Sequence, residues 1–528
     1  MYDVLLKNGR IVDGCGNPWY KADVGIKDGR VVRIGDLQEA EAAEFVDVAD
    51  RVVAPGFIDI HCHSDVLSLK EPRESGKVLQ GVTTEVVGNC GNSVAPVSEE
   101  LLPLFLKQAS PTFRDKSVMW NWRSVGEYLD RIDEHQTIGN VATLVGHGML
   151  RLNAMGFDDR QPTPQELHRM KELAAEALED GAFGVSSGLI YPPGIFSQET
   201  EMIEVCRTVA AKGGFYATHI RNEADNLIPS VEEAIRVAER AGIALEISHH
   251  KAAGRQNWGK CQTTLALLEE SRTRGFDATC DLYPYVAAST SLKTLLPPWM
   301  HDGGIAALLE RLRRPEVQDQ VRRELDEGLP GWENSAKNTG WNGVMIAYCQ
   351  KNTVYEGKTI QQIADAEGQD PADVLFRIVL DEDGLALMNI FLMTEDDVKT
   401  ILRHPLSMIG SDAIPSTGKP HPRFYGTFPR VLAKYVRDEK TITLQEGVRK
   451  MTSLPAQKLG LRDRGVLREG AWADIVVFDP ETIQDKATFA EPAQYPLGID
   501  HVLVNGVTAV RHSQYTGSLS GRTLRRGR

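Results

Sequence analysis

The chain lacks most of the features that mark a specialised class of protein. No apolar run reaches about 18 residues, the length at which a membrane-spanning helix becomes a candidate. The first residues follow a strand pattern rather than the basic and then apolar pattern of a signal peptide. The seven cysteines are odd in number and widely spread, so they do not indicate a disulfide framework. We therefore expect a cytoplasmic protein that does not bind membranes.

Basic residues are also in deficit. The 59 Lys and Arg residues are outnumbered by 73 Asp and Glu, which gives a formal net charge of −14 at pH 7. This balance argues against nucleic acid as a partner. It does not argue against an anionic small molecule, because a local basic pocket can outweigh the overall field. With 528 residues, of which 42% are hydrophobic and 25% charged, the chain is expected to form about two to four globular domains. Nothing in the sequence indicates an oligomeric state.

A pair of histidines follows a predicted buried strand. The run 53–60 is short and apolar and contains Pro55-Gly56 near its start, which favours a strand over a helix. Side chains alternate along a strand, so His61 and His63 point to one face and Cys62 to the other. Two neighbouring imidazoles are suitable ligands for a divalent metal.

Other apolar runs also stop at residues that could bind a metal or carry a proton. These residues are Cys90, His219, His249-His250 and Asp412, and further strand-like runs cover 141–147, 183–188 and 277–283. Helical patterns such as 164–178 and 230–241 separate most of the runs. Eight strands that alternate with helices predict an α/β fold, the (β/α)8 TIM barrel. The carboxyl ends of barrel strands meet at one mouth, so we expect these residues to share a site.

The two chain ends predict a second domain. Hairpins are expected at Asn8-Gly9 and Asp28-Gly29, and strands of the same type at 473–478 and 502–507. We predict a small β-sandwich built from 1–54 and 465–528, beside a barrel that covers 55–464. Between the seventh strand and Asp412 lies far more chain than one βα unit needs, which indicates an inserted subdomain at about 285–345. The basic end 522–528 is expected to be a disordered tail.

Five motifs carry a resemblance to a known family. The segment 55–63, Pro-Gly-Phe-Ile-Asp-Ile-His-Cys-His, resembles the first-strand signature of the amidohydrolase superfamily. The other four resemble the N-acyl-D-amino-acid deacylases, or D-aminoacylases: 88–96, 216–221, 247–251, and Ser411-Asp412 followed by 421–428. The match runs from about residue 3 to about residue 480. Two departures are Cys62, where Thr or Ser is usual, and Ala413, where Gly is common.

The resemblance implies a zinc enzyme. A thiolate prefers a soft or borderline cation, so Cys90 favours zinc over magnesium or calcium, although a strand-end cysteine can also be a small core residue. His219 and His249 would complete the ligand set and leave a fourth position open for water. His249 and His250 compete for one role, and the interval of 30 residues from His219 matches the family when His249 is chosen.

The first histidine pair has two interpretations. His61 and His63 could hold a second zinc with Cys90 as the bridging ligand, and the resemblance implies that this site is weaker and need not be filled. Alternatively, both histidines orient water and Asp412. Asp412 is interpreted as the general base, which takes a proton from water on the metal and returns it to the departing amine. It could also be a metal ligand, and the two roles do not exclude one another.

The implied reaction is hydrolysis of an N-acyl-D-amino acid to a carboxylate and a free D-amino acid. The planar fork of Arg423 matches the α-carboxylate of such a substrate. Lys251 and Tyr283 resemble family positions that face the same group, and Tyr191 could bind the oxyanion or the carboxylate. For each of these residues, a surface or packing role is the alternative. The side chain that the enzyme prefers does not follow from the sequence.

Two rival functions remain at this stage. A cyclic-amide hydrolase of the dihydroorotase or hydantoinase type commonly holds a carboxylated lysine between two metals, whereas here Cys90 takes the place that would bridge them. A catalytically silent scaffold is disfavoured by the intact set of ligands with Asp412.

Overall fold

The computed structural model describes residues 1–109 and 111–527. Its centre is the predicted (β/α)8 barrel, which is confirmed. The barrel strands, all parallel, are β6 (Phe57–Asp59), β7 (Val82–Val87), β8 (Asn140–Thr143) continued by β9 (Val145–Gly146), β10 (Gly184–Gly188), β11 (Phe215–His219), β12 (Ala244–Ile247), β13 (Ala278–Leu282) and β17 (Ser407–Ile409).

Helices surround the barrel in the order that the sequence pattern predicts. They are α1 (Leu102–Gln108), α2 (Val125–His135), α3 (His147–Met155), α4 (Pro164–Asp180), α5 (Glu199–Ala211), α6 (Leu227–Ala241), α7 (Cys261–Thr273), α13 (Glu395–Arg403), α14 (Arg423–Arg430), α15 (Leu444–Met451) and α16 (Ser453–Leu459). Local signals fix their ends: Thr163 and Glu166 form a capping box before α4, and Gly242 ends α6 in the left-handed conformation. No helix among the described residues is both long and apolar enough to cross a membrane.

The barrel closes where the eighth strand meets the first. The backbone N–H of Asp412 donates to the carbonyl of His61 over 2.7 Å. One residue before Asp412, Ser411 donates from its backbone to Asp59 Oδ1 over 2.8 Å and from its hydroxyl to Oδ2 over 2.6 Å. Lys77 is buried beside them, forms an ion pair with Asp59 and donates to the Ser411 hydroxyl over 2.6 Å. This seam sets the positions of the residues that follow both strands.

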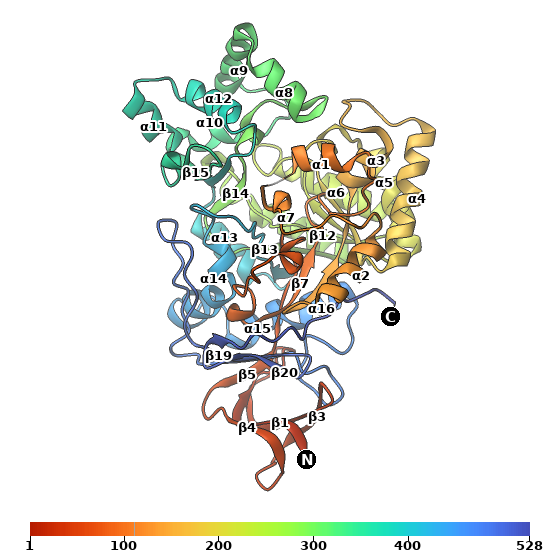
Figure 1. Ribbon diagram of the computed structural model, residues 1–528, viewed down its shortest axis with the longest axis vertical. Coiled ribbons are helices and arrows are strands. Elements are labelled where there is room, and N and C mark those ends of the chain that lie inside the picture. Colours follow the sequence, from red (N-terminus) through yellow and green to blue (C-terminus); the bar gives the residue numbers. More distant parts are fainter. Residues whose placement is uncertain (110, 528) are drawn as a thin grey trace.

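Both chain ends build one sheet at the far end of the molecule (Figure 1). Its strands are β1 (Tyr2–Ile11), β2 (Tyr20–Lys27), β3 (Arg30–Gly35), β4 (Ala42–Asp47), β5 (Val52–Pro55), β18 (Ile475–Phe478), β19 (Ile499–Val504), β20 (Val507–Arg511) and β21 (Gln514–Tyr515). The two halves join where β5 pairs antiparallel with β18. The boundaries at 54 and 465 stay predictions.

One predicted hairpin is wrong. Asp28-Gly29 does turn the chain between β2 and β3, but Asn8-Gly9 lies inside the single strand β1. Asn8 has a φ of 65°, and the register with β2 shifts between Leu6 and Gly9, so this left-handed residue makes a bulge. A Cβ on Gly9 would lie 2.6 Å from Val53, so the close approach of β5 explains the glycine.

The inserted subdomain covers the mouth of the barrel and is drawn in green and teal at the top of Figure 1. Its strands are β14 (Ala287–Ser291), β15 (Val344–Tyr348) and β16 (Leu387–Phe391), and its helices are α8 (Gly304–Leu312), α9 (Pro315–Glu327), α10 (Ser335–Thr339), α11 (Ile360–Glu367) and α12 (Pro371–Asp381). Since β16 lies between β14 and β15, the unit extends past the predicted end at about 345 to Phe391.

The carboxyl-terminal segment is not the disordered tail that its basic composition suggested. Thr523 pairs with Val141 at the base of the barrel, and Leu524 is buried. Arg525 forms an ion pair with Asp130 over 2.5 Å.

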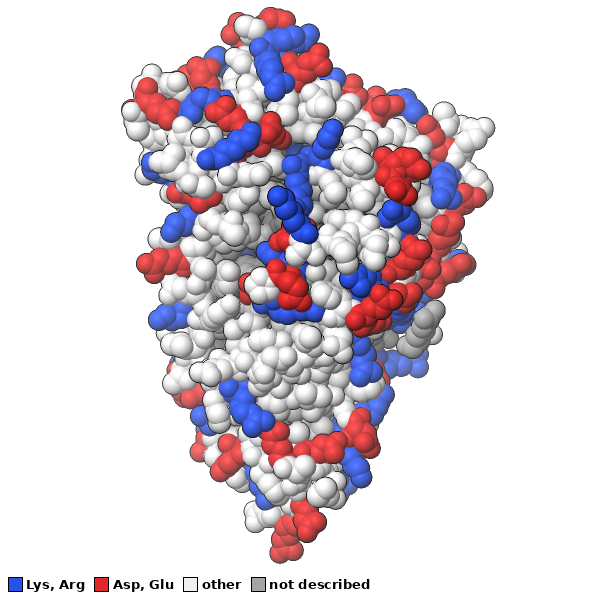
Figure 2. All heavy atoms as spheres, in the orientation of Figure 1, with Lys and Arg blue, Asp and Glu red and all other residues white. Residues whose placement is uncertain are grey.

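Figure 2 shows acidic and basic side chains interspersed over the face in view.

The buried ion pair at the barrel seam gives a stability prediction. Lys77→Met leaves the Asp59 carboxylate buried without its cation, and breaking such a pair costs about 3–5 kcal/mol. We expect a clear fall in the midpoint of thermal unfolding, measured by scanning calorimetry. The control is Lys351→Met, which removes an exposed ion pair with Asp383 and should change the midpoint little. Equal, small shifts in both variants would show that the seam does not depend on Lys77.

Candidate active site

The strand ends bring the predicted metal ligands together at the barrel mouth. Cys90 follows β7, and its Sγ faces three imidazole rings. It lies 3.3 Å from Nε2 of His61, which follows β6. It lies 3.4 Å from Nε2 of His249, after β12, and 3.9 Å from Nδ1 of His219, at the end of β11. All four side chains are buried, so this is an enclosed cluster of one sulfur and three nitrogen donors.

Three residues of the site have a left-handed backbone. The φ angles are 53° at Cys90, 37° at His249 and 48° at Asp412. A non-glycine residue in this region is strained by about 1–3 kcal/mol, and such residues concentrate at functional sites. Each of the three directly follows, or lies within three residues of, the end of a barrel strand. The turn away from the strand therefore aims each side chain into the mouth.

The structure separates the two adjacent histidines. His249 points toward Cys90, whereas His250 points away, with its Nε2 2.8 Å from the Thr264 hydroxyl. Burial is the main cause that lowers the pKa of His250 to about 4, so it is a neutral, packed residue. The arrangement favours His249 over His250 as a ligand.

Two carboxylates that the sequence analysis missed contact the ring nitrogens of His61 and His249 that face away from Cys90. Asp281 Oδ2 lies 3.2 Å from Nδ1 of His61, and its Oδ1 accepts the backbone N–H of His249 over 3.0 Å. Glu223 Oε1 lies 3.0 Å from Nδ1 of His249. Histidine ligands are commonly held in this way by a carboxylate on the second ring nitrogen. The signals that could have identified them are an acid within the apolar run of β13, for Asp281, and an acid four residues after a predicted ligand, for Glu223.

The donor set fits zinc. Burial by itself raises the pKa of the Cys90 thiol, but the charges of His61 and His249 outweigh it and hold that pKa well below its ordinary value. A thiolate with imidazole nitrogens is a set that zinc prefers, and Cys90, His219 and His249 would leave one position open. The Nε2 of His219 is buried without a hydrogen-bond partner among the described residues, although Glu223 Oε2 lies 3.8 Å away.

Asp412 lies beside this cluster. Its Oδ1 is 3.1 Å from Nε2 of His63 and 3.6 Å from Nε2 of His61, and its Oδ2 is 2.9 Å from a guanidinium nitrogen of Arg423. Burial raises the pKa of the Asp412 carboxyl, but the positive charges of Arg423 and His249 overcome this and keep the pKa well below its usual value. Asp412 is therefore ionised at neutral pH, the form that a general base needs.

Three of the four predicted substrate-binding residues, Lys251, Tyr283 and Tyr191, line the cavity at the mouth, whereas Arg423 is fully buried behind Asp412 and Tyr283 and lines no part of it. Lys251 is buried and donates to Glu223 over 2.6 Å, and its Nζ lies 2.7 Å from His249 Nδ1. Arg423 stacks on the Tyr283 ring at 4.5 Å. The Tyr283 hydroxyl is buried and has no hydrogen-bond partner among the described residues. Tyr191 contacts the Thr290 hydroxyl over 3.1 Å.

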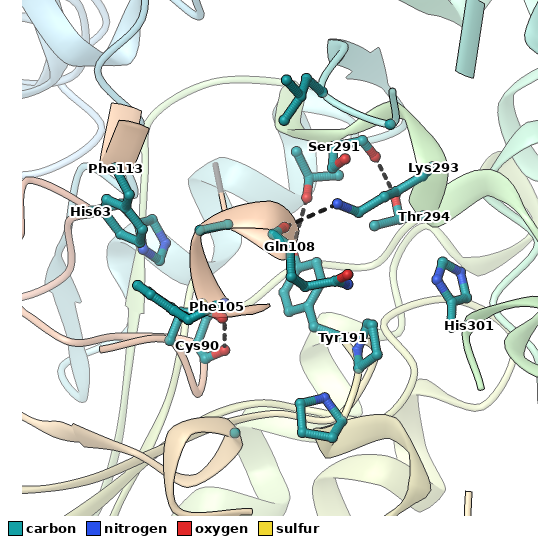
Figure 3. Close-up of a pocket in the computed structure, with 18 of the residues that line it drawn as sticks. His63, Cys90, Phe105, Gln108, Phe113, Tyr191, Ser291, Lys293, Thr294 and His301 are labelled. Atoms are coloured by element: carbon teal, nitrogen blue, oxygen red, sulfur yellow. Dashed lines mark hydrogen bonds between the residues drawn. The ribbon is translucent and has the colours of Figure 1, made fainter. Parts of the chain in front are cut away.

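Two adjoining pockets that share four lining residues lie at the mouth, and we call them the large lobe and the small lobe. The large lobe is about 280 Å³, and its walls include His219, Lys251, Tyr283, Ser289, Met388 and Asp412. The small lobe is about 140 Å³, and its walls include His63, Cys90, Phe105, Phe113, Met149, Leu152, Lys293 and Leu387 (Figure 3). Tyr191, Thr290, Thr294 and His301 line both. The inserted subdomain thus contributes walls to each lobe, through β14 and β16.

Comparison with known proteins identifies similar sequences and structures. Residues 44–510 match the sequence model of a family described as the Amidohydrolase family. The D-aminoacylase of Alcaligenes xylosoxydans xylosoxydans is 38% identical over 99% of this chain and 98% of its own. The N-acyl-D-glutamate deacylase of Bordetella bronchiseptica was solved with zinc and a phosphonate that mimics the tetrahedral intermediate. It matches with a TM-score of 0.85 and 36% identity over 99% of both chains.

A D-aminoacylase structure with a binuclear metal centre matches equally well. Its TM-score is 0.85, with 36% identity over 100% of both chains. That protein is described as activated by one metal and attenuated by a second.

The cluster around Cys90 gives a prediction about metal content. Cys90→Ser should lose the tightly bound zinc, because serine replaces the soft thiolate with a weaker ligand. Zinc per chain is measured by atomic emission after dialysis against a weak chelator. The control is Cys206→Ser, a buried cysteine on α5 outside the cluster, which should keep its zinc. Full zinc in the folded Cys90 variant would remove Cys90 from the ligand set.

Proposed function

This chain belongs to the amidohydrolase family, and we propose on that premise that it hydrolyses N-acyl-D-amino acids to a carboxylate and a free D-amino acid in a zinc-dependent reaction. The observation that carries the proposal is the Cys90 sulfur facing His219 and His249, with the Asp412 carboxylate in the same cluster as Cys90 and His249. The full-length similarity to D-aminoacylase and N-acyl-D-glutamate deacylase supports the substrate class.

In this proposal Cys90, His219 and His249 hold the zinc. The metal, when bound, supplies Lewis acidity that polarises the amide carbonyl and lowers the pKa of water. His61 and His63, on the other side of the Cys90 sulfur, are available for a second and weaker ion. The relative that is activated by one metal and attenuated by a second supports this division.

Asp412 moves the proton. Its carboxylate is ionised, so it can accept a proton as water attacks the carbonyl carbon and then deliver that proton to the departing amine. The contacts with His63 and Arg423 fix both of its oxygens. A carboxylate held in this way needs no reorganisation before it accepts the proton.

The α-carboxylate is proposed to bind in the large lobe. The Tyr283 hydroxyl is an available donor, while the Lys251 ammonium and the Arg423 guanidinium supply positive charge beside it. Tyr191 lies between the lobes, near His219, where its hydroxyl can donate to the oxyanion. With the carbonyl and the carboxylate fixed, the side chain has one direction for a given hand. The D hand follows from the relatives.

A cytoplasmic location is part of the proposal. All seven cysteines are free, six of them buried, as expected for a protein of a reducing compartment.

The proposal is tested with N-acetyl-D- and N-acetyl-L-amino acids, read by amine release, with a hydantoin as control. We expect turnover of D substrates in the zinc-loaded protein and much less of the L forms. Preference for L substrates, or for the cyclic amide, would contradict the proposed function.

The general base has its own test. Asp412→Asn keeps the shape of the side chain but cannot accept the proton, so kcat should fall by about 10²–10⁴-fold. Zinc content should be retained if Asp412 does not bind the metal. Unimpaired turnover would exclude Asp412 from the role, and loss of zinc would assign it as a ligand instead.

The carboxylate site is tested most cleanly by Tyr283→Phe, which removes one hydroxyl that bonds nothing else in the described chain. We expect kcat/KM for N-acetyl-D-methionine to fall about tenfold or more, since a hydrogen bond to a charged group is worth about 1.5–3 kcal/mol. Tyr285→Phe is the control, because Tyr285 is equally buried but lines neither lobe. Equal losses in the two variants would indicate a packing role for Tyr283.

A further inference from the structure

The small lobe differs from the large one in the groups that it offers to a substrate. Lys251 and Tyr283, which we place beside the α-carboxylate, line the large lobe, and neither of them lines the small one. An amide carbonyl carbon carries the nitrogen on one side and the acyl chain on the other. With the amino acid in the large lobe, the acyl chain therefore points into the small lobe, which starts at Cys90 and His63.

The small lobe is larger than an acetyl group needs. Its volume is about 140 Å³, and an engineered protein cavity of about 150 Å³ holds a benzene molecule. Most of its walls are apolar and buried, among them Phe105, Phe113 and Met149. These dimensions suit an acyl chain of about six carbon atoms.

One wall residue of this mostly apolar lobe is a lysine. Lys293 is only 7% exposed, and its ammonium donates to the backbone carbonyl of Gln108 over 3.1 Å (Figure 3). It forms no ion pair with any carboxylate of the described residues. Burial, together with the nearby positive charge of Arg114, lowers its pKa to about 8.

The other buried lysines show how unusual this is. Five lysines are buried among the described residues, and the four besides Lys293 each pair with an acid. These pairs are Lys77–Asp59, Lys251–Glu223, Lys450–Glu446 and Lys458–Asp277. A buried ammonium without a counter-ion is unfavourable, so this position is suited to an anion supplied from outside the chain.

We propose that the small lobe receives the acyl group and that Lys293 selects acyl chains that end in a carboxylate. The substrates would be N-(ω-carboxyacyl)-D-amino acids, hydrolysed with water to a dicarboxylate and a free D-amino acid. This inference rests on the proposed function and specifies its substrate class.

The experiment compares substrates of equal chain length. Succinyl, glutaryl and adipoyl derivatives of D-methionine are measured against butanoyl, pentanoyl and hexanoyl derivatives, with N-acetyl-D-methionine as reference. At least one dicarboxylic substrate should exceed its neutral partner about tenfold in kcat/KM. Lys293→Met should bring that ratio to about one, and Lys293→Arg should largely restore it. Lys107→Met, an exposed lysine one residue before Gln108 on the same helix, should leave the ratio unchanged.

The results that would contradict the role of Lys293, the assignment of the small lobe and the proposed function differ from one another. Neutral chains preferred at every length, or a ratio that Lys293→Met does not alter, would overturn the role of Lys293. Acetyl turnover faster than that of every longer chain would overturn the assignment of the lobe. Absence of turnover on all N-acyl-D-methionines, the acetyl form included, would instead contradict the proposed function.

Discussion

The hydrogen-bonded seam between the first and eighth barrel strands is the contact on which the site depends. The Asp412 N–H to His61 carbonyl bond ties together the backbones of a proposed base and a candidate ligand. Beneath it, Asp59 accepts two hydrogen bonds from Ser411 and pairs with buried Lys77. A shift of one strand against the other would move Asp412 away from His63 and Arg423 at the same time. The geometry of proton transfer is therefore set by barrel closure.

The charges of the site are balanced in layers around the Cys90 sulfur. Imidazole rings surround the thiolate, and Asp281 and Glu223 hold the far nitrogens of two of these rings. Lys251 then pairs with Glu223. Because these buried charged groups lie beside polar or oppositely charged partners, their burial is tolerated. The strained backbone is held by hydrogen bonds at two of its three positions, from the His249 N–H to Asp281 and from the Asp412 N–H to the His61 carbonyl.

Much of this could be predicted from the order of residues along the chain. Strand alternation placed His61 and His63 on one face, and the convergence of strand ends predicted that Cys90, His219 and Asp412 would meet. Contacts between side chains of different strands could not be predicted in this way. Asp281 and Glu223 carried no pattern of their own, and the bulge at Asn8 depends on the pairing of β1 with β2 and β5. That Lys293 has no acid opposite it is a property of the folded chain only.

The pairing of β5 with β18 also has a consequence for synthesis on the ribosome. Strands β1 to β5 emerge before the barrel, yet the partner of β5 begins only at Ile475, after the whole barrel has been translated. Until then the nascent protein carries an open sheet edge, the kind of surface that recruits other chains. Translation speed and chaperone supply therefore bear on the yield of this protein more than on that of a barrel whose flanking sheet is encoded in one piece.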